Sequence, residues 1–189
     1  QQSVARVRTR DAETALAEKR SFTTRPLEDA DWPAIIRLYN RNNARRTLSI
    51  VRNARTFRRL RHGSGFHKKG ECFVVETAKG AFAGYAVMDS PPDPLVACEV
   101  ETVDHAAYPA VLARLTRAAI KRRDGEIAVQ LPLDHPFLSH LRRFGCTVTQ
   151  IFKNTGAIMG RFTNQDATLS KLAAAYEAER GAGRGRNGY

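Results

Sequence analysis

The sequence predicts an α/β domain in which a mixed, mostly antiparallel sheet of about six or seven strands carries helices on both faces. Runs rich in Val, Phe and Tyr alternate with segments of helical periodicity between residues 22 and 163. A strand, a helix and a second strand follow one another over 96–131. That order is typical of a central, right-handed βαβ crossover, which makes its two strands parallel. Of the 189 residues 42% are hydrophobic, which is enough for one buried core.

Capping and turn residues set the expected boundaries of these elements. Asp29 or Asp31 should begin a helix, and Tyr108–Pro109 should open another because Pro is favoured in a first helical turn. Gly145 should end the helix that begins near Asp134. Strands are expected at about 22–26, 72–76, 82–88, 96–103, 127–131, 148–152 and 157–162. Helices are expected at about 9–21, 29–39, 53–61, 108–123, 134–145 and 166–180.

Four parts are expected along the chain. These are an N-terminal helix or linker at 1–21, the main domain at 22–163, a C-terminal helix at 164–180 and a disordered Gly/Arg tail at 181–189. The chain begins with Gln1 rather than Met, which indicates either a trimmed sequence or a further segment upstream. No apolar run approaches the roughly 18 residues that cross a bilayer, and the first residues lack the apolar core of a secretory signal. We therefore expect a cytoplasmic protein with no membrane-spanning segment.

The cysteines and histidines do not form a recognisable metal motif. Cys72, Cys98 and Cys146 lie far apart and lack C-x-x-C spacing, and the five histidines show no zinc pattern. The three cysteines are predicted to be buried, reduced thiols, as is usual in the cytoplasm. No metal site is expected.

The net charge of +12 comes from one segment of the chain. Residues 37–69 hold eleven Lys or Arg and no acid, whereas the rest of the sequence is nearly neutral. Apolar residues such as Phe57 and Leu60 should anchor this basic segment to a core. It is either a solvated face or a surface for an anionic partner, such as a small substrate or an acidic or phosphate-bearing macromolecule. Nucleic acid is included, although no RNP-like or helix-turn-helix signature is present.

Two glutamates in one expected strand are the candidate catalytic residues. Because side chains alternate along a strand, Glu99 and Glu101 should share a face. Val96, Cys98 and Val100 should take the other face. Two carboxylates are costly to bury, so they indicate either a polar cleft or an ion-pair network with arginines of the basic segment. Either alternative places the basic segment beside the glutamates.

The order of elements and three stretches of sequence resemble the GCN5-related N-acetyltransferase (GNAT) superfamily over about residues 22–163. The stretches are Thr23-Thr-Arg-Pro-Leu-Glu-Asp-Ala-Asp-Trp32, Gly80-Ala-Phe-Ala-Gly-Tyr-Ala-Val-Met88 and Leu133-Asp-His-Pro136 through Leu141-Arg-Arg-Phe-Gly145. The last strands and the trailing helix look like the second unit of tandem GNAT proteins. The resemblance therefore implies an upstream GNAT-type domain or a homodimer.

The resemblance implies an enzyme that transfers an acyl group from acetyl-CoA to an amine, with Glu99 and Glu101 beside the amine. In the family, the loop after the fourth strand holds the CoA pyrophosphate at a helix N-terminus. The matching positions here are Val103, His105, Ala106, Ala107, Tyr108 and Ala110. This loop departs from the family pattern because it has no glycine and contains Asp104 and Pro109. Asp104 is expected to cap the helix.

The resemblance also places the first two helices and their link beside the acceptor. Four arginines there are candidate substrate-binding residues: Arg41, Arg45, Arg52 and Arg55. They favour an acceptor amine on an anionic or phosphate-bearing compound. The family's usual tyrosine acid is absent near the start of the fourth helix, where Phe137 and His140 stand, which leaves Tyr108 and Tyr85 as alternatives. The competing hypothesis is a GNAT-like domain without cofactor that serves a structural or partner-binding role.

Overall fold

The computed structural model describes residues 2–17, 21–46, 49–55, 71–89, 95–151 and 173. The chain divides into two units, Gln1–Phe152 and Lys153–Tyr189, and nearly all of the described residues belong to the first. The second strand expected at 157–162, the helix expected at 166–180 and the tail at 181–189 lie outside the described residues, as does most of the helix expected at 53–61.

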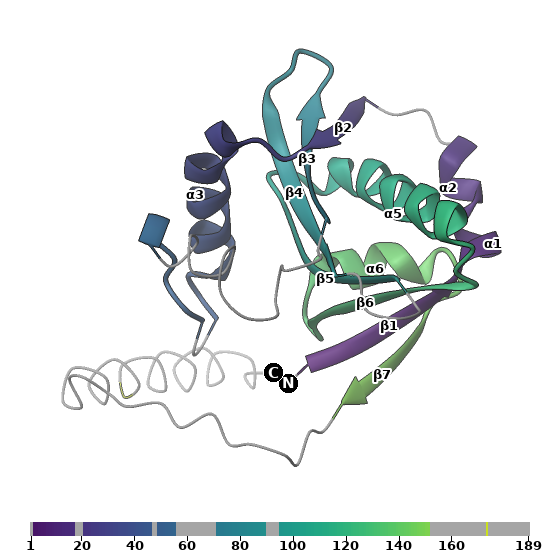
Figure 1. Ribbon diagram of the computed structural model, residues 1–189. Helices are drawn as coiled ribbons and strands as arrows, with labels where there is room; N and C mark the ends of the chain where they lie inside the picture. The colour runs from purple at the N-terminus through teal and green to yellow at the C-terminus, as the bar shows by residue number, and fades with distance from the viewer. Residues whose placement is uncertain are drawn as a thin grey trace, which may run out of the picture. The chain divides into compact units, whose positions relative to one another are not determined.

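A mixed sheet of seven strands forms the centre of the first unit, in the order β2-β3-β4-β5-β6-β1-β7 (Figure 1). Its strands are β1 (Gln2–Arg8), β2 (Phe22–Pro26), β3 (Glu71–Thr77), β4 (Phe82–Asp89), β5 (Leu95–Thr102), β6 (Glu126–Pro132) and β7 (Thr147–Ile151). Every neighbouring pair is antiparallel except β5 and β6, which are parallel. The predicted fold class and the parallel pair at the crossover are therefore confirmed.

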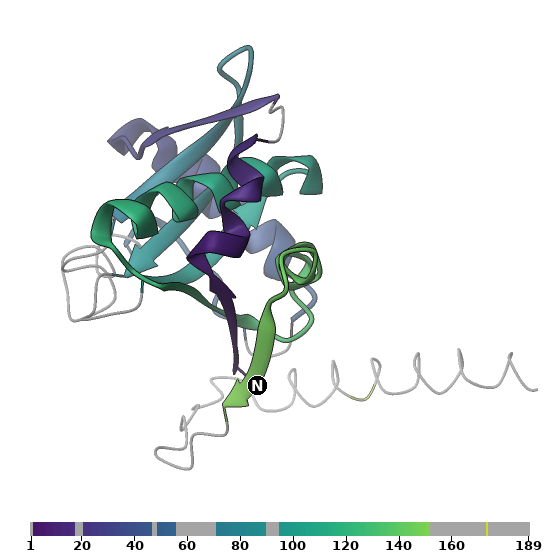
Figure 2. The same ribbon diagram turned by 90° about the vertical axis from the view of Figure 1, so that its right-hand side faces the viewer.

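Helices cover both faces of the sheet. They are α1 (Thr9–Ala12), α2 (Thr14–Ala17), α3 (Trp32–Asn43), α5 (Tyr108–Arg122) and α6 (Pro136–Arg142), with short 3₁₀ turns at Asp29–Asp31 and His105–Ala107. α3 buries Ile35 and Leu38 against one face, where Tyr85 and Val87 lie. α5 packs on the other face within the larger core, and α1 and α2 lie alongside it (Figure 2). None of the helices in the described part of the chain combines the length and apolar character that a membrane crossing requires.

The N-terminal segment differs from its prediction. Residues 9–17 are helical as expected, but residues 2–8 form β1, which lies between β6 and β7 and pairs with both. Val4, Ala5 and Val7 are buried there. The expectation that 1–21 is a helix or linker outside the domain is therefore wrong for residues 2–8, because they are a strand of the sheet. In the sequence of β1, which contains Arg6 and Arg8, apolar and polar residues do not alternate clearly enough to indicate a strand.

A β-bulge at Cys98 sets the direction of the side chains that follow on β5. The pairing of β4 with β5 shifts register there, since Val87 opposes Glu99 and Met88 opposes Ala97. Cys98 packs on the α3 side, and Val100 packs in the core on the α5 side. The expectation that these two residues share a face is therefore wrong, because a bulge adds a residue and reverses the alternation.

The parallel strands β5 and β6 separate soon after they meet. Only Leu95, Val96 and Ala97 of β5 have partners on β6, opposite 127–129. Beyond the Cys98 bulge, the two strands continue to Thr102 and Pro132 without further pairing to each other. This divergence leaves the carboxyl ends of two parallel strands apart at the N-terminus of α5. In open α/β sheets, ligands commonly bind at such a place.

Candidate functional site

A pocket of about 400 Å³ lies where β5 and β6 separate. Its walls come from the end of α3, the end of β5, the start of α5 and the turn between β6 and α6. Its lining includes Asn42, Arg45, Arg46, Glu101, Thr102, Val103, His105, Tyr108, Asp134 and His135. Arg46 and Asp134 form an ion pair of 3.5 Å that joins the end of α3 to the turn after β6. The pocket is therefore framed by charged groups of both signs.

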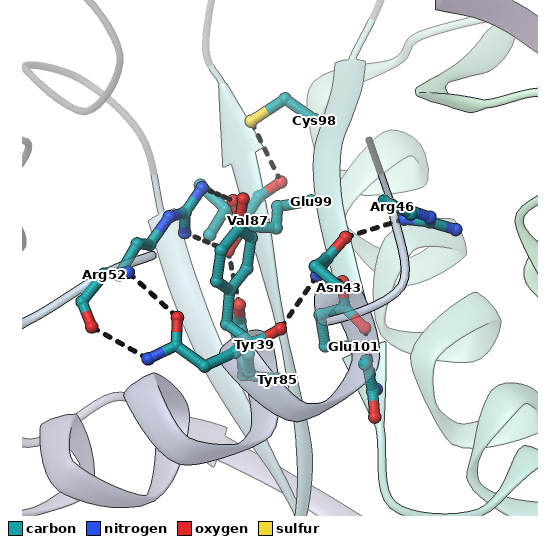
Figure 3. Close-up of polar contacts among 11 residues, drawn as sticks. Tyr39, Asn43, Arg46, Arg52, Tyr85, Val87, Cys98, Glu99 and Glu101 are labelled. Atoms are coloured by element: carbon teal, nitrogen blue, oxygen red, sulfur yellow. Dashed lines mark hydrogen bonds and ion pairs between the residues drawn. The ribbon is translucent and has the colours of Figure 1, made fainter. Parts of the chain in front are cut away.

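Glu101 is the buried carboxylate of this pocket. It is 5% exposed, and neutral amides hold both of its oxygens: Asn42 Nδ2 donates to Oε2 at 2.8 Å and Asn43 Nδ2 donates to Oε1 at 2.8 Å (Figure 3 shows Glu101 and Asn43). Burial raises the pKa of Glu101, the two amides lower it, and the net shift is upward. Among the described residues Glu101 makes no ion pair, and each of its oxygens can accept one further hydrogen bond.

A glycine on β4 allows Glu101 to take its position. Gly84 pairs with Thr102, and a Cβ added to Gly84 would lie 2.6 Å from the Glu101 carbonyl oxygen. The next residue, Tyr85, pairs directly with Glu101. The close approach of the two backbones therefore requires glycine at this point of the stretch Gly80-Ala-Phe-Ala-Gly84-Tyr85.

Glu99 shares the face and the burial of Glu101 but belongs to an ion-pair network. Arg52 Nη1 and Nη2 donate to its two carboxylate oxygens at 2.7 and 2.8 Å, and the Tyr85 hydroxyl donates to the same carboxylate (Figure 3). The guanidinium carbon of Arg52 also lies 3.5 Å from the centre of the Tyr39 ring. Although burial lowers the pKa of Arg52, the hydrogen bonds and charge of Glu99 raise it above its usual value. The buried Glu99 carboxylate and the half-buried Arg52 guanidinium thereby neutralise each other within the protein.

Asn40 fixes the backbone of Arg52. Its Oδ1 accepts from the Arg52 N–H at 2.9 Å, and its Nδ2 donates to the Arg52 carbonyl at 2.8 Å. The basic segment is therefore attached to α3 and β5 at Arg52, as the glutamate and arginine patterns predicted. Of the two alternatives, Glu99 takes the ion-pair role and Glu101 lies in the polar pocket.

The other predicted substrate-binding arginines are distributed over different places. Arg45 lines the Glu101 pocket. Arg41 lines a second pocket on α3. Arg55 is exposed and belongs to the lining of neither pocket. Arg52 is bound to Glu99, so the four arginines do not all line one pocket.

Tyr108 is the hydroxyl-bearing aromatic residue of the Glu101 pocket. Its ring stacks on His105 with centroids 5.0 Å apart and also contacts the rings of Phe137 and His140. Burial raises the pKa of Tyr108, while the neighbouring Thr102 side chain lowers it to a smaller degree. No hydrogen bond of standard geometry reaches Thr102 Oγ1 from any residue the structure describes, although that atom is buried. Tyr85, the other tyrosine considered, is bonded to Glu99 instead.

His135 is a buried residue in the lining of this pocket. Its Nδ1 accepts from the Phe137 N–H at 3.2 Å, and it thereby caps α6. Burial, followed by the positive charge of Arg46, lowers the pKa of His135 to about 4, while a hydrogen bond to the Val100 backbone acts in the opposite sense. His135 is therefore a neutral imidazole that links the turn after β6 to β5.

The loop before α5 does not fit the pyrophosphate of CoA. The Asp104 carboxylate accepts from the Ala106 N–H at 2.9 Å, and its carbonyl accepts from the Ala107 N–H at 3.1 Å. The Tyr108 N–H is bonded to the His105 carbonyl, and Pro109 has no N–H. The N–H groups of Ala106, Ala107 and Tyr108 are thus bonded within the chain, and the Asp104 carboxylate beside them would repel a phosphate. The predicted capping role of Asp104 is confirmed.

Sequence reasoning did not identify the amides that hold Glu101. Asn42 and Asn43 are adjacent at the last turn of α3, and Asn43 is buried, with its Oδ1 accepting from Arg46 at 2.8 Å. Two consecutive asparagines at the end of an amphipathic helix are an available signal, because asparagine disfavours a helix interior. Their partner on β5 could not be read from the sequence.

Comparisons with known proteins establish the fold. No protein-family model matches the sequence, and no curated protein matches it significantly. Among solved structures, a GCN5-related N-acetyltransferase from Anabaena variabilis is similar with a TM-score of 0.57 and 12% identity, over 79% of this chain and 38% of that protein. One from Kribbella flavida has a TM-score of 0.54 and 13% identity, over 71% and 31% of the two chains.

A third similar structure is the spermidine N-acetyltransferase from Vibrio cholerae in complex with CoA and spermine. Its TM-score is 0.51 at 18% identity, over 65% of this chain and 78% of that one. The chain thus spans less than two thirds of the Anabaena and Kribbella proteins. At these identities the likeness shows that the chain has the GNAT fold, as the sequence predicted.

Proposed function

We propose that this GNAT-fold domain binds a primary amine at Glu101 and does not hold CoA through the loop before α5. The observation that carries the proposal is the environment of Glu101. Its buried carboxylate lines a pocket, its hydrogen-bond partners are neutral amides, and its oxygens can accept further hydrogen bonds. An ammonium group that enters the pocket would lose part of its hydration shell and gain a charge-assisted hydrogen bond to the Glu101 carboxylate. The proposal corresponds to the competing hypothesis of a GNAT-like domain without cofactor that serves a partner-binding role.

Calorimetric titration with a simple alkylamine, such as n-butylamine, tests the amine site. The wild type should bind more tightly as pH rises through the raised pKa of Glu101, because the carboxylate must be ionised to hold the ammonium. Glu101→Gln should weaken binding by roughly 10-fold or more, since hydrogen bonds to charged groups contribute about 1.5–3 kcal/mol. Glu13→Gln, at an exposed position, is the matched control and should bind as the wild type. Equal affinity in Glu101→Gln and the wild type would refute the amine site.

The CoA part of the proposal has its own test. Millimolar CoA should leave the melting temperature of the wild type unchanged, because the N–H groups before α5 are occupied. Asp104→Gly removes the carboxylate and frees the Ala106 N–H, so a gain of stabilisation by CoA in this variant would support the stated cause. A clear rise in the wild-type melting temperature would overturn the proposal.

A second candidate function is acyl transfer from acetyl-CoA to the amine of an anionic acceptor. The raised pKa of Glu101 favours it, because a base that accepts a proton from an ammonium works best when its pKa is closer to neutral. It requires CoA to bind without the loop before α5. Release of CoA thiol from acetyl-CoA in the presence of an amine, abolished in Glu101→Gln, would establish this function in place of the first.

A further inference from the structure

A second pocket, of about 440 Å³, lies beside the Glu101 pocket. Its lining combines one face of α3 with the start of β4 and the end of β5: Ala34, Arg37, Leu38, Arg41, Phe82 and Val103. Val103 belongs to the lining of both pockets. Asn42, which donates to Glu101, directly follows Arg41 on α3. The last turns of this helix therefore connect the two pockets.

Two arginines give the second pocket its chemical character. Arg37 and Arg41 are one helical turn apart, so both guanidinium groups project from the same face of α3. Both are exposed, and within the described ranges neither forms an ion pair. Among the residues that the structure describes, the one hydrogen bond of the Arg41 side chain is a long contact of 3.4 Å from Nε to Asn42 Oδ1.

The positive charges of these two arginines, which no described residue neutralises, are unfavourable beside each other. Like charges at this helical spacing repel each other, and a bound anion removes the repulsion. Leu38, Phe82 and Val103 supply apolar walls beside the guanidinium groups. Guanidinium groups next to apolar surface are suited to a carboxylate, phosphate or sulfonate that is attached to a hydrocarbon chain.

We propose that the two pockets are the two ends of one site for an amine that also carries an anion. The ammonium binds Glu101, and the carboxylate, phosphate or sulfonate at the other end of the molecule binds Arg37 and Arg41. This inference rests on the amine site proposed above. Arg37 and Arg41 form the anion end of the site, whereas Arg52 is bound to Glu99 and Arg55 lines neither pocket.

The arrangement also explains why the exposed Val103 side chain is placed at the end of β5. Val103 is 53% exposed, and its N–H continues the sheet by donating to the Ala83 carbonyl at 2.8 Å. A hydrocarbon chain that links the ammonium to the anion would pass over this side chain and cover it. Apolar surface removed from water in this way stabilises the complex.

A series of ω-amino carboxylates of increasing chain length tests the inference, with the n-alkylamine of equal length as the reference for each member. Calorimetric affinities should pass through a maximum at one length, where the amino carboxylate binds at least 10-fold more tightly than its alkylamine. The double variant Arg37→Gln/Arg41→Gln should abolish that advantage. Repeating the best length with ω-amino phosphonates and sulfonates identifies the preferred anion.

The matched control is Arg117→Gln/Lys121→Gln, which removes two cations one turn apart on the exposed face of α5. This variant should still bind the amino carboxylate more tightly than the alkylamine, as the wild type does.

If alkylamines bind in a Glu101-dependent manner but amino carboxylates bind no more tightly, the second subsite is refuted and the amine site stands. If neither series binds, both proposals fail. Binding of a single-stranded oligonucleotide that depends on Arg37 and Arg41, with no advantage for amino carboxylates, would also overturn the inference, because the arginines would then serve a polyanion.

Discussion

Glu99 and Glu101 lie two residues apart on β5, on the same face and with similar exposure of 7% and 5%, yet their surroundings give them different roles. Glu99 meets the guanidinium of Arg52 and the hydroxyl of Tyr85, so its charge is matched within the protein. Glu101 meets two neutral amides and faces a pocket. Burial alone therefore does not distinguish the two carboxylates, whereas the charge of their hydrogen-bond partners does.

The largest expected effect comes from breaking the Glu99 ion pair. Glu99→Gln removes the carboxylate charge that the half-buried Arg52 guanidinium faces and should lower the free energy of unfolding by about 3 kcal/mol or more. Chemical denaturation measures the change. The double variant Glu99→Leu/Arg52→Met should recover most of the loss, because it removes both buried charges. A Glu99→Gln variant as stable as Glu101→Gln would contradict the distinction between the two glutamates.

The next effect concerns His135, whose buried imidazole responds to pH in the opposite sense from Glu101. Its pKa of about 4 lies below the usual value of 6.5, so the unfolded chain binds the proton more readily. Stability should therefore fall as pH drops from 6.5 towards 4, by about 2 kcal/mol at pH 5 relative to neutral pH. His135→Asn keeps a side chain that can cap α6 and should flatten this part of the stability profile. An unchanged profile in that variant would refute the assignment.

The smallest effect is the contribution of Glu101 itself to stability. Because its pKa is raised in the folded state, stability should fall as pH rises from the unfolded value of 4.5 through the folded pKa. Glu101→Gln should remove this fall and change the stability at neutral pH by about 1 kcal/mol or less. Thermal denaturation at a series of pH values measures it. A loss as large as that of Glu99→Gln would mean that Glu101 is a structural residue.

Strands and helices with clear periodicity were predictable from the sequence. β3, β4, α5 and α6 lie close to their expected positions, because alternating or helical apolar patterns and turn residues such as Gly80 and Gly145 mark them. β1 was missed because a short strand inserted between two others leaves no local sign of its partners.

The candidate site was predictable only in part. Side-chain alternation placed Glu99 and Glu101 on one face, and the arginine count placed cations beside them. The sequence could not decide which glutamate pairs with Arg52, since that depends on how the chain after α3 crosses β5. The Cys98 bulge, the amides of Asn42 and Asn43, and the buried His135 are likewise consequences of tertiary packing.

The most direct test of the role of Glu101 is an NMR titration of its side-chain carboxyl carbon in the selectively ¹³C-labelled protein, with and without n-butylamine. In the free protein the pKa of Glu101 should lie above the usual glutamate value, and it should fall when the amine binds, because a nearby ammonium favours the carboxylate. The contradicting result is a pKa at or below the usual value in the free protein, or one that does not move when the amine is added.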